Sequence, residues 1–289
     1  MPPPSPKLSI VMLTYNRAQM ISRAIYSVCE QTFEDWELII VQDGSNPEIE
    51  ALLREWSEKE PRIRYFPRGT VGSIAEASNF GLGKARGQYI AILDDDDYWA
   101  TADKLARQIE FLDTHPDYVG CAGAYIVVDA GGRERGRFTK PEKDREIRAR
   151  ALIVNPIANS TSVFRRLVKG GPALYDAGLR QFADWDFWLM MGAKGKLFNF
   201  PEYLTYYALW DGGSSFKHQK ENARAALRII FKHRASYPGF PAALAMAWLY
   251  FCYAHLPGPL RRISYERFST FKKSLTGVRG SLATNRHEG

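Results

Sequence analysis

The 289-residue sequence contains only three cysteines, Cys29, Cys121 and Cys252, and they lie far apart. This spacing matches no metal-binding pattern, and it predicts reduced, buried thiols in a cytoplasmic protein. The proline-rich opening MPPPSPK is expected to form a disordered or polyproline-like tail over residues 1–7. It has no apolar stretch of the secretory type, so export is not expected. These features favour a cytoplasmic location.

The sequence also lacks an apolar run of the roughly 20 residues that a bilayer-spanning helix needs. The nearest candidate, PAALAMAWLYFCYAHLP, is too short, and a basic stretch follows it. Two alternatives remain open: the helix packs on the main domain, or it lies peripherally at the inner membrane face. From residue 217 onward 13 Lys and Arg face 3 Asp and Glu, a balance of +10 against +7 for the whole chain. This excess predicts an anionic surface as partner, a membrane or a polymer but not a nucleic acid.

A dinucleotide fingerprint is missing as well. The segment GLGKARG, Gly81–Gly87, comes before an expected strand instead of opening a helix after one. It is typical of a helix end and turn, so a nicotinamide-dependent dehydrogenase is disfavoured.

Apolar runs of strand length alternate with segments of helical spacing over the first hundred residues. The expected strands are residues 8–13, 37–42, 62–66 and 88–93, with helices between them, including residues 46–59 and 73–84. This order predicts an α/β fold with a mainly parallel sheet whose ligands bind beyond the carboxyl ends of the strands. We expect one domain over residues 8–216, divided near residue 117, and a basic helical extension over residues 217–289.

Four consecutive aspartates, Asp94–Asp97, follow the strand at residues 88–93. One of them could cap a helix that begins near Thr101, but a cap explains only one carboxylate. The cluster instead favours a site for Mg²⁺ or Mn²⁺ bound to substrate phosphates. Asp43 follows an earlier strand and could either shape a turn or belong to the same site.

The segment ADWDFWLMMGAKG, residues 183–195, has the pattern of a helix. Asp184 could cap this helix or serve in a site, and both interpretations remain open. Asp186 is two positions further on and cannot share a helix face with Asp184. Trp188 is expected in the core.

Four segments in this order resemble family 2 glycosyltransferases of the GT-A type. They are SIVMLTYNR, ELIIVQDGS, NFGLGKARGQYIAILDDDDYW and FADWDFW, and the likeness extends from about Leu8 to Ser215. The resemblance implies a GT-A (Rossmann-like) fold, mixed and mainly parallel. It also implies inverting transfer of a sugar from a nucleotide-sugar donor, with a UDP-sugar expected, to a hydroxyl of a glycan or lipid-linked acceptor in cell-envelope or exported glycan synthesis.

The resemblance also assigns roles to individual residues. Thr14, Tyr15, Asn16, Arg17 and Asn79 would contact the nucleotide sugar, and Asp43 would accept a hydrogen bond from the base. Asp96 would bind Mg²⁺ or Mn²⁺, and Asp94 and Asp95 would lie near the ribose or the metal, with Asp94 a second metal ligand. Asp184 would be the catalytic base.

Some positions depart from the family pattern. Gln42 stands where family members often have an acidic residue, Ser78 where they often have Arg, and Ala183 where they often have Glu. The Arg and His that family members often have after the last core strand are absent near Ala208 and Trp210. His218 or Lys217 could replace that His. The segment NSTSVFRR, residues 159–166, is expected as an edge strand or as an acceptor contact. A metal-dependent nucleotidyltransferase and a degenerate binding module remain the alternatives.

Overall fold

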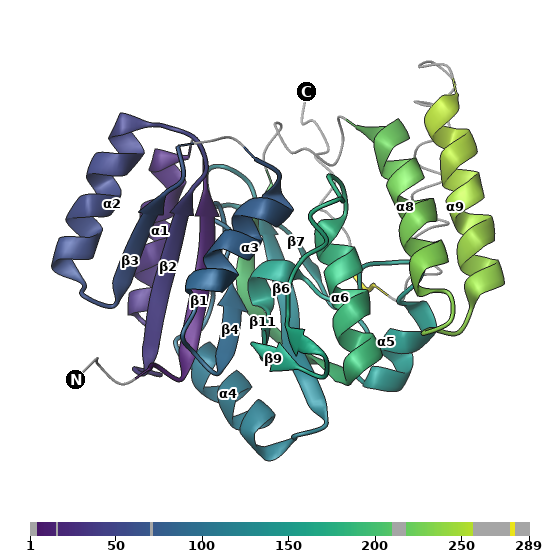
Figure 1. Ribbon diagram of the computed structural model, residues 1–289, viewed down its shortest axis with the longest axis horizontal. Coiled ribbons are helices and arrows are strands. Elements are labelled where there is room, and N and C mark those ends of the chain that lie inside the picture. Colours follow the sequence, from purple (N-terminus) through teal and green to yellow (C-terminus); the bar gives the residue numbers. More distant parts are fainter. Residues whose placement is uncertain (1–4, 16, 70–71, 210–217, 257–277, 281–289) are drawn as a thin grey trace.

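The computed structural model in Figure 1 describes residues 5–15, 17–69, 72–209, 218–256 and 278–280. Asn16, Trp210, Lys217 and the basic stretch that follows Pro257 lie outside these residues. The strands are β1 (Leu8–Thr14), β2 (Trp36–Gln42), β3 (Ile63–Pro67), β4 (Tyr89–Ile92), β5 (Tyr98–Trp99), β6 (Tyr118–Val128), β7 (Glu134–Phe138), β8 (Val163–Arg165), β9 (Leu167–Val168), β10 (Gly171–Pro172) and β11 (Lys196–Ala208). The helices are α1 (Ala18–Cys29), α2 (Pro47–Lys59), α3 (Ile74–Lys84), α4 (Lys104–Thr114), α5 (Asp144–Arg150), the 3₁₀ helix η1 (Asn159–Thr161), α6 (Ala183–Lys194), α8 (Gln219–His233) and α9 (Phe240–His255).

The main sheet has nine strands in the order β3-β2-β1-β4-β8-β6-β11-β5, with β7 paired to β6. β3, β2, β1 and β4 are mutually parallel, and β11 is parallel to β6, whereas β8 is antiparallel to both β4 and β6. The mixed, mainly parallel sheet predicted from the sequence is therefore confirmed. The parallel strands also bring the ends of β1, β2 and β4 to one edge.

Alternate side chains of the strands enter two cores. Leu8, Ile10 and Met12 of β1 pack with α1, α2 and α4 on one face of the sheet. Val11 of the same strand packs with α3 and α6 on the other face. This period of two is the reason that continuous apolar runs were expected to be strands buried on both faces.

Local signals explain the helix starts that were predicted most closely. The side chain of Asn46 accepts hydrogen bonds from the first-turn amides of α2, and Pro47 occupies the first helical position. Ser73 and Glu76 form a reciprocal capping box at the start of α3. The glycine-rich end of α3 then turns into β4, as expected, and Gly87 is required there because a Cβ would lie 2.5 Å from the Ser9 amide nitrogen.

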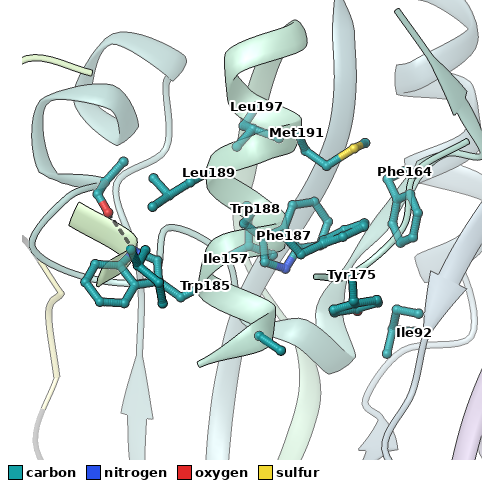
Figure 2. Packing of buried hydrophobic residues seen from close by; sticks show 14 of the residues in the cluster. Ile92, Ile157, Phe164, Tyr175, Trp185, Phe187, Trp188, Leu189, Met191 and Leu197 are labelled. Atoms are coloured by element: carbon teal, nitrogen blue, oxygen red, sulfur yellow. Dashed lines mark hydrogen bonds between the residues drawn. The ribbon is translucent and has the colours of Figure 1, made fainter. Parts of the chain in front are cut away.

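Helix α6 is anchored in an aromatic cluster (Figure 2). The ring of Phe187 stacks on that of Tyr175, with 4.4 Å between the ring centroids. It also forms edge-on pairs with Phe164 and Trp188, whose ring centroids lie 5.1 Å and 5.2 Å away. Trp185 donates its indole N–H to the carbonyl of Ala151 at 2.7 Å. The core position expected for Trp188 is confirmed, and the packing fixes the helix that carries Asp184.

Several expectations were wrong. Strand β8 lies between β4 and β6 inside the sheet and is not an edge strand, because a three-residue strand carries too little pattern to show its neighbours. Residues 131–136, whose Gly- and Arg-rich composition predicts a turn, are in part strand β7, which forms a hairpin with β6. Cys252 is exposed and Cys29 is half-buried, so only Cys121 is a buried thiol, although all three are free.

The C-terminal helices α8 and α9 pack on each other and lie beside α6 (Figure 1). The inner side of α9 buries Ala243, Met246 and Ala247, which establishes that this helix packs on the protein. Its outer side exposes Trp248 and Leu249 by 52% and 50%. Within the described residues, no helix is both long and apolar enough to cross a bilayer.

Candidate active site

The predicted site lies in a cleft of about 1360 Å³. The ends of β1, β2 and β4 form one wall, because parallel strands place their carboxyl ends at the same edge. The N-terminus of α6 and the helices α8 and α9 contribute other walls. Of the predicted site residues, those that line the cleft are Thr14, Tyr15, Arg17, Asp43, Asp94, Asp95, Asp96 and Asp184.

The four aspartates occupy a tight turn after β4. The Asp97 amide donates to the Asp94 carbonyl at 3.1 Å, and the Asp97 carboxylate accepts from the Ala208 amide at 3.0 Å. Asp97 thus fastens the turn to the end of β11, which agrees with a shaping role. The helix-cap alternative is wrong for this cluster, since α4 begins only at Lys104 and β5 intervenes.

Arg17 supplies a positive charge to this cluster. Its Nη1 lies 2.6 Å from Asp95 Oδ1 and 3.0 Å from Asp96 Oδ2. Arg17 follows the end of β1, so the register of β1 beside β4 brings the guanidinium to the aspartates. The Asp95 side chain is 2% exposed, which makes this pair strongly shielded from water on the carboxylate side.

The carboxylates still exceed the charge of one guanidinium. Burial, followed by repulsion from Asp96 and Asp95, raises the pKa of Asp94 to about 7. Burial also raises the pKa values of Asp95 and Asp97. Such oxygen donors fit Mg²⁺ or Mn²⁺. Within the described chain, no three His, Cys, Asp or Glu side chains are placed to hold a metal on their own. A cation here would therefore complete its shell with phosphate and water oxygens.

Asp43 lies at the end of β2 and is already hydrogen-bonded. Its Oδ1 accepts from Arg68 at 2.9 Å, and its Oδ2 accepts from the Gly72 amide at 2.9 Å. The Asp43 amide in turn donates to the Thr14 carbonyl, which joins the ends of β2 and β1. Each carboxylate oxygen keeps a second lone pair, so the expected contact with a base remains compatible with this geometry.

Tyr15 and Thr14 differ in exposure. Tyr15 is 51% exposed although it lines the cleft, whereas Thr14 is buried. An exposed aromatic ring in a concave site offers a flat surface for a base. Asn16 was predicted beside them but lies outside the described residues.

Asn79 is placed differently from the prediction. Its Nδ2 donates to the Tyr175 carbonyl at 2.9 Å, and its Oδ1 accepts from the Tyr175 amide at 2.8 Å. Asn79 is not among the described residues that line the cleft. The side chain therefore joins α3 to the segment that precedes α6, and direct contact with a ligand stays a prediction without geometric support.

Asp184 lies in the first turn of α6, where the helix N-terminus favours a negative charge. Asn155 donates its side-chain amide to Asp184 Oδ2 at 2.7 Å. The helix cap is Phe182 and not Asp184, so the capping alternative is wrong. Phe182 is the only described non-glycine residue with positive φ, at 58°. Burial raises the pKa of Asp184 above its usual range.

A half-buried lysine lies near this carboxylate. Lys140 Nζ donates to the carbonyls of Asn155 at 2.7 Å and Ile157 at 3.1 Å. Its charge lowers the pKa of Asp184 in part, while burial lowers the pKa of Lys140 itself to about 8. A smaller cavity of about 350 Å³ has Lys140, Asp94 and Asp184 in its walls. The aspartate cluster and Asp184 therefore face a common space.

Asp186 contacts different residues from Asp184, because side chains two positions apart in a helix lie on different faces. It is buried, with His233 Nε2 2.8 Å from Oδ1 and Lys232 Nζ 2.8 Å from Oδ2. Lys232 also bonds to Asp176 at 2.8 Å. These contacts join α6 to α8, so the helix that carries Asp184 is fixed to the C-terminal extension.

Sequence reasoning missed Asn155, Lys140 and Arg68. Each is an isolated polar residue with no motif around it, and each acts through a partner that is distant along the chain. His218, offered as a replacement for the absent His, does line the cleft immediately before α8. Asn159 also lines it, in agreement with the position expected for an acceptor contact.

The mixed, mainly parallel sheet, with an aspartate turn after β4 and Asp184 in the wall of the same cleft, has the architecture of the GT-A fold. The profile of "Glycosyl transferase family 2" matches residues 9–168, more than half of the chain. The chain belongs to this family.

Similar proteins agree with that assignment. An uncharacterized glycosyltransferase of Haemophilus influenzae is 26% identical over 78% of this chain and 72% of its own length. A Rickettsia bellii uncharacterized glycosyltransferase is also 26% identical, over 77% of this chain, but the match spans 32% of the longer protein.

Solved structures share the fold. Staphylococcus aureus TarS residues 1–349 with UDP-GlcNAc has a TM-score of 0.61 at 18% identity, covering 86% of this chain and 72% of that one. The mannosyltransferase PcManGT of Pyrobaculum calidifontis, with GDP-Man and Mn²⁺, has a TM-score of 0.61 at 17% identity, covering 95% and 84%. At such identities the likeness supports the fold and leaves substrates open.

Proposed function

We propose that this glycosyltransferase moves a sugar from a nucleotide-sugar donor, a UDP-sugar in the first instance, to an acceptor hydroxyl with inversion. One observation carries the proposal: Asp94 and Asp184 border both the same cleft and the same inner cavity. A phosphate-binding cluster and a separate base on opposite sides are what a single displacement at the anomeric carbon needs.

Different residues bind different parts of the donor. Tyr15 and Asp43 bind its nucleobase, and Arg17 and the aspartate turn bind its diphosphate. Mg²⁺ or Mn²⁺, bound by Asp96 and Asp94, would stabilise the negative charge on the diphosphate. The TarS structure contains UDP-GlcNAc, and the PcManGT structure contains GDP-Man and Mn²⁺. Both support a nucleotide-sugar donor.

Asp184 performs the proton transfer. Its carboxylate removes the proton of the acceptor hydroxyl while the acceptor oxygen forms a bond to the anomeric carbon. The bond from that carbon to the diphosphate breaks, and the nucleoside diphosphate leaves with the electron pair. Asn155 donates a hydrogen bond that orients the Asp184 carboxylate. The raised pKa of Asp184 favours its uptake of the proton.

The C-terminal extension is proposed as a peripheral membrane anchor at the inner face, in a pathway of cell-envelope or exported glycan synthesis. Its excess of Lys and Arg and the exposed Trp248 and Leu249 support contact with an anionic lipid surface. Co-sedimentation with vesicles of neutral or anionic lipid tests this role. Equal sedimentation of wild type and a Trp248→Ser, Leu249→Ser double variant with anionic vesicles would reject it.

Product analysis tests the reaction. The purified protein is incubated with UDP- and GDP-sugars, with Mn²⁺ or with chelator, and the nucleotide products are separated. Release of nucleoside diphosphate, by transfer or by slow hydrolysis, is expected. Pyrophosphate release would indicate a nucleotidyltransferase, and binding without turnover would indicate a degenerate module.

A further inference from the structure

The smaller cavity beside the cleft has no ligand assigned to it so far. Its volume is about 350 Å³, near the lower end of the range of about 300–1,000 Å³ that is usual for small-ligand pockets. The residues that line both the cavity and the cleft are Asp94, Asn155, Asn159, Asp184, Tyr207 and Leu209. These shared residues form the opening between the two spaces. The cavity therefore suits a single sugar ring, and it opens beside the proposed base.

Charge is distributed unevenly along this cavity. The carboxylates of Asp94 and Asp184 belong to the opening. The inner end consists of the residues that line the cavity but not the cleft, which are Tyr125, Val127, Phe138, Lys140, Ile157, Ala158, Ser160, Thr161 and Thr205. Among these described residues, Lys140 is the one with a charged side chain. The opening is thus acidic, and the inner end is basic.

The ammonium group of Lys140 can still bind a ligand. It donates to the carbonyls of Asn155 and Ile157, and a lysine has three N–H groups, so one remains. Burial lowers the pKa of Lys140, and the charge of Asp184 opposes this shift without forming an ion pair. Lys140 has no carboxylate ion-pair partner within the described part of the chain. Carbonyl groups satisfy its donors but do not neutralise its charge, and an anion in the cavity would do so.

Two tyrosines give the cavity an aromatic side. Tyr207 of β11 pairs with Val127 of β6, two residues beyond Tyr125, so the alternation of side chains places both rings on one face of the sheet. Their centroids are 5.9 Å apart. Tyr207 is 44% exposed and Tyr125 is partly exposed, so both rings offer surface to a ligand. Aromatic walls with a few polar groups are usual in small-ligand pockets, and they suit the C–H face of a sugar ring.

We propose that this cavity binds the acceptor sugar that carries the reacting hydroxyl, and that this sugar bears an anionic substituent bound by Lys140. The hydroxyl lies at the opening beside Asp184, the ring lies along Tyr125 and Tyr207, and the substituent is directed to the inner end. The inference rests on the proposed function, since it names the substrate class of the same site. A uronic acid carboxylate matches the single charge of one ammonium group, and a phosphate ester is the other source of such a charge.

Methyl glycosides in matched sets provide the probe. Each set contains a uronide, the neutral hexoside of the same configuration and its 6-phosphate, in the gluco, galacto and manno series. Ligand-observed NMR gives the dissociation constants in the presence of UDP and Mg²⁺, so the measurement does not depend on turnover. We expect the uronide of at least one series to bind about tenfold more tightly than its neutral partner, as a hydrogen bond to a charged group would give.

Variants separate the charge from the aromatic surface. Lys140→Gln removes the charge but keeps N–H groups for the loop carbonyls, and it should abolish the preference for the uronide. Lys140→Arg should retain the preference, and Lys143→Gln, which removes an exposed charge from the same segment, is the control. Tyr207→Ala should weaken binding of the uronide and the neutral glycoside by the same factor. If Lys140→Gln does not fold, Lys140→Met takes its place.

Each outcome bears on one proposal or the other. Equal affinities within every set overturn the inference, as do binding of no glycoside and a preference that survives Lys140→Gln. Tighter binding of a 6-phosphate than of the uronide would assign the cavity to a phosphorylated sugar and overturn the uronic acid. Release of nucleoside diphosphate is measured separately. Release without a preference for acidic glycosides overturns this inference alone, whereas absence of release with every nucleotide sugar overturns the proposed function.

Discussion

The guanidinium of Arg17 lies 3.0 Å from the carboxylate of Asp96, the residue proposed to bind a metal ion. A fixed positive charge thus occupies part of the electrostatic role that a divalent cation would have. The protein can keep several carboxylates together without the metal because this side chain partly neutralises them.

Arg17→Ala should destabilise the metal-free protein by about 1–2 kcal/mol, since a shielded carboxylate loses its partner while the half-exposed arginine limits the loss. Mn²⁺ should restore more stability to this variant than to the wild type. Thermal unfolding with chelator and with Mn²⁺ measures both effects. Arg17→Lys keeps the charge and is the control. Equal Mn²⁺ effects on variant and wild type would contradict the prediction.

The raised pKa of Asp94 predicts a pH dependence. In the metal-free folded state the carboxyl titrates at about 7, compared with 3.8 for the ordinary group. The folded state therefore holds a proton that the unfolded chain has lost, so stability is highest at low pH in this window and falls as pH rises toward 7. Unfolding midpoints from pH 5 to 8 in chelator measure this slope. Asp94→Asn should flatten it, and an unchanged slope in that variant would assign the effect to other groups.

Asp184→Asn should leave donor affinity unchanged within about twofold and reduce transfer by about 100-fold or more, the usual effect of losing a general base. The amide keeps the shape of the carboxylate but cannot take a proton. Calorimetry gives the affinity, and product formation gives the rate. Asp186→Asn tests whether any carboxylate of α6 matters. Wild-type turnover by Asp184→Asn would refute the assignment.

Lys140→Met should shift the acid limb of the pH–rate profile to higher pH. The lysine charge lowers the pKa of Asp184, so its removal leaves the carboxylate protonated over a wider range. Lys143→Met removes an exposed charge from the same segment and should leave the profile in place. A fall in rate at all pH values without a shift would show that Lys140 acts only through the loop carbonyls it binds.

Asn79→Ala should cost about 1–3 kcal/mol of stability, because both backbone groups of Tyr175 lose a partner. Nucleotide affinity should change little. Asn79→Asp keeps the bond from the Tyr175 amide and should lose less. Denaturant unfolding and calorimetry separate the two effects, and a large loss of affinity in a stable variant would return Asn79 to the binding site.

The sequence predicted the parallel strands and the aspartate turn well, because continuous apolar runs and clustered charges are local signals. It placed β8 wrongly, since strand order depends on long-range pairing and β8 has only three residues. The sequence also could not decide whether Asp184 caps its helix or belongs to a functional site. That distinction depends on Phe182, which has a left-handed backbone conformation and is the N-cap residue, two positions before Asp184.

The supporting residues of the site were the least predictable. Asn155 meets Asp184 29 positions later, and Arg68 meets Asp43 25 positions earlier. An asparagine or arginine in a loop has many possible partners, and only the folded chain selects one. The charged cluster was visible from the sequence, whereas its counter-ions were not.

The bond network of Asp186 limits how this chain can be recombined. A chimaera joined at residue 217, the boundary expected from the change in composition, would give α6 a foreign α8 without Lys232 and His233. Asp186 would then be a buried, unpaired charge within α6, the helix that carries Asp184. Exchange of acceptor preference between relatives would therefore succeed only when α6, α8 and α9 are inherited together as one unit.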